Sequence, residues 1–128
     1  MKKYAKSWKS SRKKKKQVVY RALAPSHLRR KMLSSHLSKE LRQKYKRRSI
    51  ALRKDDTVKV MTGEFKKKQG KVIRIDAKRY KVYVEGIQTT KKEGTKINVP
   101  FDPSNLQIIS LNLDDKKRNE KLNLRIGK

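Results

Sequence analysis

The fold of this chain is decided by a stretch in its middle, Lys71-Val72-Ile73-Arg74-Ile75, then Asp76-Ala77-Lys78-Arg79, then Tyr80-Lys81-Val82-Tyr83-Val84-Glu85. Both outer runs are rich in β-branched and aromatic residues, which favour strands. The short polar segment between them therefore predicts a hairpin. Upstream, Thr57-Val58-Lys59-Val60-Met61 alternates apolar and polar residues with a period of two. We expect this run to be a first strand that completes a three-stranded meander.

Two further strands are predicted, Lys96-Ile97-Asn98-Val99 and Leu106-Gln107-Ile108-Ile109, separated by a turn-rich segment at 100–105. Five short strands within residues 57–111 favour closure into a small barrel, because closure removes exposed strand edges. The predicted fold class is thus mainly β, a five-stranded barrel preceded by short basic helices and an extended N-terminal arm. We expect an apolar lining made by Val58, Val60, Ile73, Ile75, Val82, Val84, Ile97, Val99, Ile108 and Leu111.

The charge of the chain indicates its partner. Its 39 Lys and Arg residues exceed 11 Asp and Glu residues, a net charge of +28. Residues 1–53 hold only one acid, Glu40. Such a chain repels itself, so we expect its working state to include a polyanion such as nucleic acid. No segment approaches the ~18 consecutive apolar residues of a membrane span. Met1-Lys2-Lys3-Tyr4-Ala5-Lys6 lacks the apolar region of a secretory signal, so no membrane insertion is expected.

The residues that support catalysis are sparse. The chain has no Cys and only two His, His27 and His36, which excludes thiol chemistry and disfavours a metal site. Both His are predicted at helix starts, where they cap or stack. Two carboxylate pairs, Asp55-Asp56 and Asp114-Asp115, lie at element boundaries among Lys and Arg, which predicts capping or ion pairing. We therefore expect no enzyme, no cofactor and no metal.

Residues 1–23 show no apolar periodicity and are expected to be disordered in isolation and ordered on RNA. Trp8 has two interpretations, stacking on an unpaired base or packing on the protein's own surface. The arm's cations are predicted to neutralise phosphates, which adds to the candidate site Lys2, Lys3, Lys6, Lys9, Arg12, Lys13, Lys14, Lys15 and Lys16.

Residues 24–52 change in pattern. A proline and apolar residues at helical spacing predict a helix over about 25–34, and Ser35 is expected to cap a second helix with Leu37, Leu41 and Tyr45 on one stripe. Almost no acids are available to pair with the charged faces of these helices, which favours phosphate contact. The candidate residues here are His27, Arg29, Arg30, Lys31, Lys39, Arg42, Lys44, Lys46, Arg47, Arg48 and Arg53.

The loop between Gly63 and Gly70 carries the next signal. Both glycines are expected to adopt positive φ and to let RNA backbone approach, since they lack side chains. The plain alternative is a hairpin turn with solvated lysines. With the following Gly70-Lys71-Val72-Ile73, the loop resembles the KOW motif of ribosomal and transcription-elongation proteins. Its candidate RNA-binding residues are Gly63, Lys66, Lys67, Lys68, Gly70 and Lys71.

The flanking segments narrow this resemblance. They are Ala24-Pro25-Ser26-His27-Leu28-Arg29-Arg30-Lys31, Leu37-Ser38-Lys39-Glu40-Leu41-Arg42-Gln43-Lys44-Tyr45, Arg53-Lys54-Asp55-Asp56 and Tyr83-Val84-Glu85-Gly86-Ile87-Gln88. From about residue 10 to residue 118, the chain resembles the archaeal/eukaryotic-type KOW ribosomal protein of the large subunit. Two departures are a run of lysines where the family's loop usually has another glycine and one more residue, and a shorter C-terminal tail than in cytosolic eukaryotic members.

The resemblance implies an SH3-like barrel that binds the 5′ portion of large-subunit ribosomal RNA early in assembly, beside the exit of the nascent-chain tunnel. It implies neighbouring ribosomal proteins and nascent-chain factors as partners, no homo-oligomer, and a cytoplasmic ribosome assembled in the nucleolus if the source is eukaryotic. The expected units are a basic RNA-binding extension (1–23), short basic helices (24–52), the KOW barrel (53–112) and a short basic tail (113–128).

Two rival functions fit less well. A transcription-elongation module uses the same KOW barrel but normally joins it to a separate α/β domain, for which residues 1–53 are too short and too charged. A DNA-compacting protein would explain the net charge of +28 but not the patterned strands. We therefore expect a structural, RNA-binding component of the large ribosomal subunit in which the cations of residues 2–53 hold most of the RNA.

Overall fold

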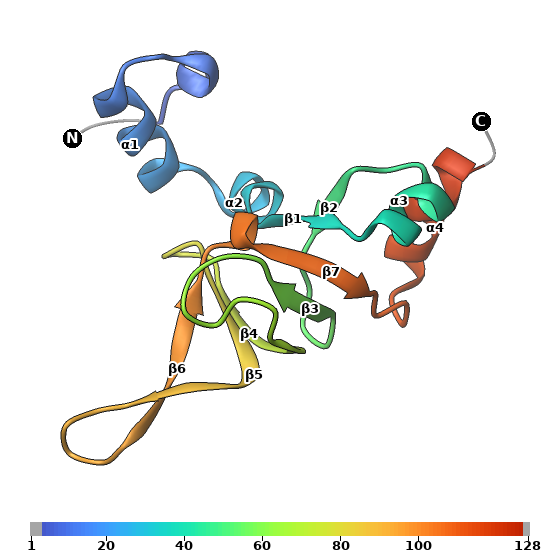
Figure 1. Ribbon diagram of the computed structural model, residues 1–128. Helices are drawn as coiled ribbons and strands as arrows, with labels where there is room; N and C mark the ends of the chain where they lie inside the picture. The colour runs from blue at the N-terminus through green and yellow to red at the C-terminus, as the bar shows by residue number, and fades with distance from the viewer. Residues whose placement is uncertain (1–3, 127–128) are drawn as a thin grey trace.

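The computed structural model describes residues 4–126, so Lys2 and Lys3 of the predicted site lie outside the described residues. Four α-helices, two 3-10 helices and seven strands follow one another along this range (Figure 1). In chain order they are η1 (Lys6–Ser10), α1 (Lys14–Leu23), α2 (Ser26–Met32), β1 (Ser34–Leu37), α3 (Lys39–Tyr45), β2 (Ser49–Ala51), β3 (Thr57–Val60), β4 (Gln69–Asp76), β5 (Lys81–Thr90), β6 (Lys96–Phe101), η2 (Pro103–Asn105), β7 (Leu106–Ser110) and α4 (Lys116–Ile126).

The strands form one mixed sheet in the order β2-β1-β7-β3-β4-β5-β6. All five predicted strands are present and adjacent in this sheet, but the prediction of a closed, mainly β barrel is wrong. The fold is mixed α/β, and hydrogen bonds do not close the sheet. The reason lies at β7, which pairs with β3 on one edge and runs parallel to β1 on the other. Because β1 occupies that second edge, β7 has no free edge left for closure onto β6.

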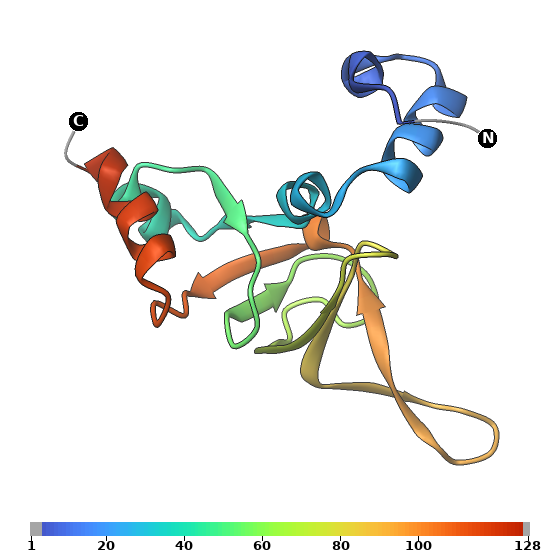
Figure 2. The same ribbon diagram turned by 180° about the vertical axis from the view of Figure 1, so that it is seen from behind.

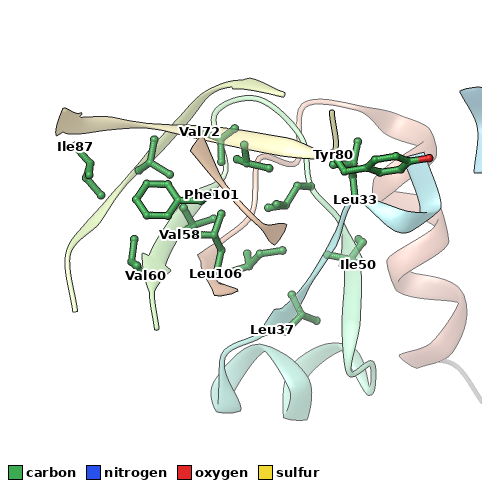
Figure 3. Close-up of a cluster of buried hydrophobic side chains, with 14 of the residues drawn as sticks. Leu33, Leu37, Ile50, Val58, Val60, Val72, Tyr80, Ile87, Phe101 and Leu106 are labelled. Carbon is green, nitrogen blue, oxygen red and sulfur yellow. The ribbon is translucent and has the colours of Figure 1, made fainter. Parts of the chain in front are cut away.

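The core lies on the inner face of the sheet and continues under the added strands β1 and β2 (Figure 3). Five residues of the predicted lining are buried, namely Val58, Val60, Val82, Val84 and Ile108. Ile75, Val99 and Leu111 pack against this core while partly exposed. Leu33, Leu37 and Ile50, which were outside the predicted lining, extend the core toward β1 and β2.

Two residues of the predicted lining are exposed instead, Ile73 (38%) and Ile97 (39%). The pairing of β4 with β5 shifts register between Val72 and Arg74, so a bulge interrupts the alternation of side chains. Val72 is therefore buried in place of Ile73. Ile97 pairs with Thr89 in the part of the β5–β6 hairpin that projects from the body in Figure 1, beyond the packed core.

The N-terminal half also departs from expectation. Residues 4–23, predicted to have no regular structure, form η1 and α1. The first predicted helix is confirmed as α2, but the second begins later, at Lys39, and its cap is Ser38, whose Oγ accepts from the Leu41 N–H at 3.5 Å. Ser35 and His36 lie in β1 instead of at a helix start. Strand β1 was missed because it is held by β2 and by β7, far along the chain.

A C-terminal helix, α4, was likewise not predicted. Its Leu122 is fully buried, and its Arg118 forms a buried bidentate ion pair with Asp56, with Nη1–Oδ1 and Nη2–Oδ2 distances of 2.7 Å. The prediction that the Asp55-Asp56 pair serves in ion pairing is confirmed at Asp56. Helices α3 and α4 lie together at one end of the molecule, opposite η1 and α1 (Figures 1 and 2).

Candidate nucleic-acid interface

The N-terminal segment 4–23, which we call the arm, is folded back on itself by one glutamine. The Gln17 side-chain amide donates to three carbonyl oxygens, those of Trp8 (3.2 Å), Lys9 (3.2 Å) and Ser11 (2.7 Å). Tyr4 packs on Tyr20 with 5.3 Å between ring centroids. These contacts hold η1 against α1 and give the arm a defined shape.

The arm presents its charge to solvent. Lys16 and Trp8 are half-buried, and the Lys16 ammonium lies 5.6 Å from the centroid of the Trp8 ring. The indole thus contacts the arm itself in this conformation, and its stacking on a base stays a prediction. The first turn of α1 contains no acid. The exposed cations of the predicted site in this segment are Lys6, Lys9, Arg12, Lys13, Lys14 and Lys15.

The arm is fastened to the body by an aromatic latch at Tyr80. The guanidinium of Arg21 lies 4.6 Å from the Tyr80 ring centroid and that of Arg29 lies 5.9 Å from it. The Tyr80 hydroxyl donates to the Arg21 carbonyl. Arg29 donates from Nε to the Ala24 carbonyl at 2.8 Å and from Nη2 to the Ala22 carbonyl at 2.5 Å. Arg29 was predicted as a phosphate ligand, and the structure engages it in ending α1.

Helices α2 and α3 carry the next group of cations. In α3 the only acid is Glu40, in the first turn. Arg42 donates from Nε to the Leu37 carbonyl at 2.9 Å, which fixes its side chain along the helix start. Lys46 ends α3 in the left-handed conformation, at φ 51°. Arg47 is half-buried. The other predicted residues of this part are exposed, namely His27, Arg30, Lys31, Lys39, Lys44 and Arg48.

His36 reports on the electrostatics of this surface. Burial lowers the pKa of its imidazole, and the positive charges of Arg42 and Arg48 lower it further. The structure thus brings two predicted phosphate ligands from different elements close enough to act on one side chain. An anion bound at these two arginines would oppose that shift.

The predicted loop closes onto the end of β3. Gly63 has a φ of +90°, as expected, and is open to solvent. The Lys67 N–H donates to the Val60 carbonyl at 2.8 Å, and Lys67 adopts φ 72°. Phe65 anchors the loop by an edge-on contact with Phe101, 6.1 Å between centroids. The loop therefore presents exposed lysines at 66, 67 and 68 from a fixed backbone.

Gly70 plays a different part from the one predicted. It lies in β4 without a positive φ, and a Cβ there would meet the Glu85 carbonyl oxygen at 2.5 Å and Val84 Cγ1 at 2.8 Å. The missing side chain thus lets β5 approach β4, where we expected it to admit RNA backbone. Lys71, its neighbour, is exposed.

At the boundary with α4, Arg53 forms an ion pair with Asp115, so this predicted cation has a protein partner. The second carboxylate pair thus also serves in ion pairing, as predicted. Two exposed groups of cations were not included in the predicted site. Their only sequence signal was their charge. They are Lys91, Lys92 and Lys96 on the β5–β6 hairpin, and Lys116, Lys117 and Lys121 on α4.

Membrane and metal sites are both missing from the described part of the chain. Among residues 4–126, no helix is both long and apolar enough to cross a bilayer. The same residues hold no cluster of three or more His, Asp or Glu side chains placed to bind a metal ion.

The sequence profile of one protein family, described as ribosomal proteins L26 of eukaryotes and L24 of archaea, matches residues 9–125. The chain belongs to this family. It is a KOW-containing component of the large ribosomal subunit that binds ribosomal RNA, and it is not an enzyme. Ribosomal RNA and other ribosomal proteins are the partners of this L26-family protein. The matched range begins in η1 and takes in α4, so the two parts that sequence patterns described least well both belong to the family's unit.

Proposed function

We propose that this L26-family protein binds the 5′ portion of large-subunit ribosomal RNA early in assembly and lies beside the exit of the nascent-chain tunnel. Its resemblance to tunnel-exit KOW proteins supports the placement. The single observation that carries the mechanism is the distribution of charge, with one acid among residues 1–53 and cations exposed along the arm, α2 and α3. Phosphate contacts of this kind dominate affinity, while RNA shape and unpaired bases supply selectivity.

Within this proposal the chain divides into an RNA-binding extension (1–23), basic helices (24–52), the KOW unit (53–112) and a basic C-terminal part (113–128). The extension and the helices hold most of the RNA, and the loop at 63–70 holds less. Cations at 2–48 are the main ligands, joined by Lys66, Lys67, Lys68 and Lys71 of the loop. Arg29 and Arg53 contribute mainly by fixing the protein's own structure, since both already have protein partners.

The wider setting follows from the same resemblance. The protein acts as a single copy in the cytoplasmic ribosome, assembled in the nucleolus if its source is eukaryotic. Nascent-chain factors at the tunnel exit are its further partners. No cofactor enters this mechanism, which consists of holding RNA segments in place.

A charge-matched pair of full-length variants tests the proposal. In the arm variant, Arg12, Lys13, Lys14 and Lys15 become Gln. In the control, Lys78, Arg79, Lys91 and Lys92 become Gln, which removes the same charge from exposed residues outside the proposed ligands. Binding to a 5′ fragment of large-subunit RNA is measured over a salt titration.

We expect the arm variant to lower the slope of log affinity against log salt by about 3, because four contacts contribute about 0.7 each on single strands. The control should leave the slope nearly unchanged. Equal slopes for the arm variant and the natural protein would refute the proposed role of the arm.

A further inference from the structure

A groove of about 1020 Å³ lies between the arm and the body. On one side its wall is the arm, through Tyr4, Lys6 and Lys9, and on the other it is α2 with η2. Figure 1 shows why the groove exists, since α1 rises from the body beside α2 and η2 instead of packing flat on the sheet. The latch at Tyr80 holds that geometry, so the groove is a feature of the fold.

The charge of the groove selects an anion. Lys6 and Lys9 line it from the arm, and Lys31 lines it from α2, all three with exposed side chains. Only one acid, Asp102, is among its lining residues in the described chain, and the Lys81 ammonium lies 2.6 Å from that carboxylate. Because Asp102 is already paired, nothing in the lining offsets the lysines.

The apolar part of the groove selects a flat ligand. Leu28 and Met32 of α2 and Tyr4 of the arm are half-buried and form part of its lining, and exposed Pro25 joins them. Faces of nucleobases can pack on such surfaces only when they are unpaired, because a duplex hides them in its stack. The groove therefore matches the two chemistries of a single strand, phosphates on its cations and bases on its apolar wall.

We propose that this groove binds a short single-stranded RNA segment, with its phosphates on Lys6, Lys9 and Lys31 and its bases against Tyr4, Leu28 and Met32. The inference rests on the proposed RNA binding and deepens it by assigning a site for unpaired nucleotides. The volume exceeds the ~300–1,000 Å³ of sites for small ligands, which leaves room for more than one nucleotide.

The test uses the full-length protein and a fluorescein-labelled oligouridylate hexanucleotide. The groove variant carries Lys9→Gln and Lys31→Gln, which remove one cation from each wall. Its control carries Lys78→Gln and Lys92→Gln, exposed residues outside the groove. Thermal melts establish that both variants stay folded.

We expect the natural protein and the control to bind the hexanucleotide equally, and the groove variant to reduce the salt slope by about 1.4, two contacts at about 0.7 each. A duplex of the same length should bind no more tightly to the natural protein than to the groove variant. Equal slopes for groove variant and control would overturn the inference. Displacement of the RNA by polyglutamate with no loss in the groove variant would overturn it as well.

Photo-crosslinking gives a second readout that does not depend on a substitution. A 4-thiouridine hexanucleotide should crosslink to peptides from residues 4–9 and 25–34, whereas crosslinks confined to the 63–70 loop would contradict the site. The two levels of the proposal are distinguishable. If ribosomal RNA fragments bind with the expected slope but the hexanucleotide does not, the groove inference alone fails, and if neither binds, the proposed function fails.

Discussion

Replacing Arg118 with Met should be the most damaging single change in the fold. The Asp56 carboxylate is fully buried and accepts two hydrogen bonds from Arg118 at 2.7 Å, one from the Asn112 N–H at 2.8 Å and one from the Arg53 N–H at 3.0 Å. Methionine would remove the guanidinium and leave a buried negative charge with two backbone donors. Arg118 also donates to the carbonyls of Asn112 (2.9 Å) and Ala51 (3.1 Å), which would lose those bonds.

Breaking a buried ion pair on one side costs about 3–5 kcal/mol. Total stabilities of domains are only about 5–15 kcal/mol, so the loss is a large fraction of what holds the protein together. One term acts in the opposite direction, since Arg118 Nε is buried without a hydrogen-bond partner among the described residues and Met would relieve that cost. We therefore expect the lower part of this range, about 3 kcal/mol.

Urea denaturation of the free protein measures this free energy, with Lys117→Met as the matched control, an exposed neighbour on the same helix. The control should unfold at nearly the natural urea midpoint. A loss below about 1 kcal/mol in the Arg118 variant, the range of an exposed ion pair, would refute the argument that this pair fastens α4 to the body.

Two other predictions follow from the same contacts. Gly70→Ala should destabilise the fold by about 1–3 kcal/mol in urea denaturation, because its Cβ would stand 2.5 Å from the Glu85 carbonyl oxygen, and a natural midpoint would show that β4 and β5 separate freely. The lowered pKa of His36 means that the folded state binds fewer protons than the unfolded one, so stability should fall as pH drops through about 6.5. RNA phosphates at Arg42 and Arg48 should raise that pKa again, and an NMR titration in which the bound and free values agree would argue against contact there.

The parts of the fold that could be predicted are those formed by neighbours in sequence. The hairpin of β4 and β5 and the helix α2 follow from local patterns. The bulge between Val72 and Arg74 could not be seen, because a one-residue shift in pairing leaves no mark on composition. Strand β1 is only four residues long and depends on β7, which lies much later in the chain, so local patterns favoured continuing a helix there.

The candidate site divides in the same way. Charge alone located the basic arm and helices, since one acid among residues 1–53 leaves the cations without intramolecular partners. It could not separate exposed cations from those that support the fold, because Arg29 and Arg53 differ from their neighbours only in their distant partners. Gly70 was read as an opening for RNA for the same reason, as its close neighbour is a strand that follows later in the chain.

The central claim, that the arm and basic helices hold more RNA than the KOW loop, is tested most directly by lysine acetylation of the protein free and within purified large subunits. Mass spectrometry then gives the protection of each exposed lysine. We predict strong protection at Lys13, Lys14 and Lys39, and little at Lys78, with the loop lysines at 66–68 between them. Full protection of the loop with reactive arm lysines would contradict the account.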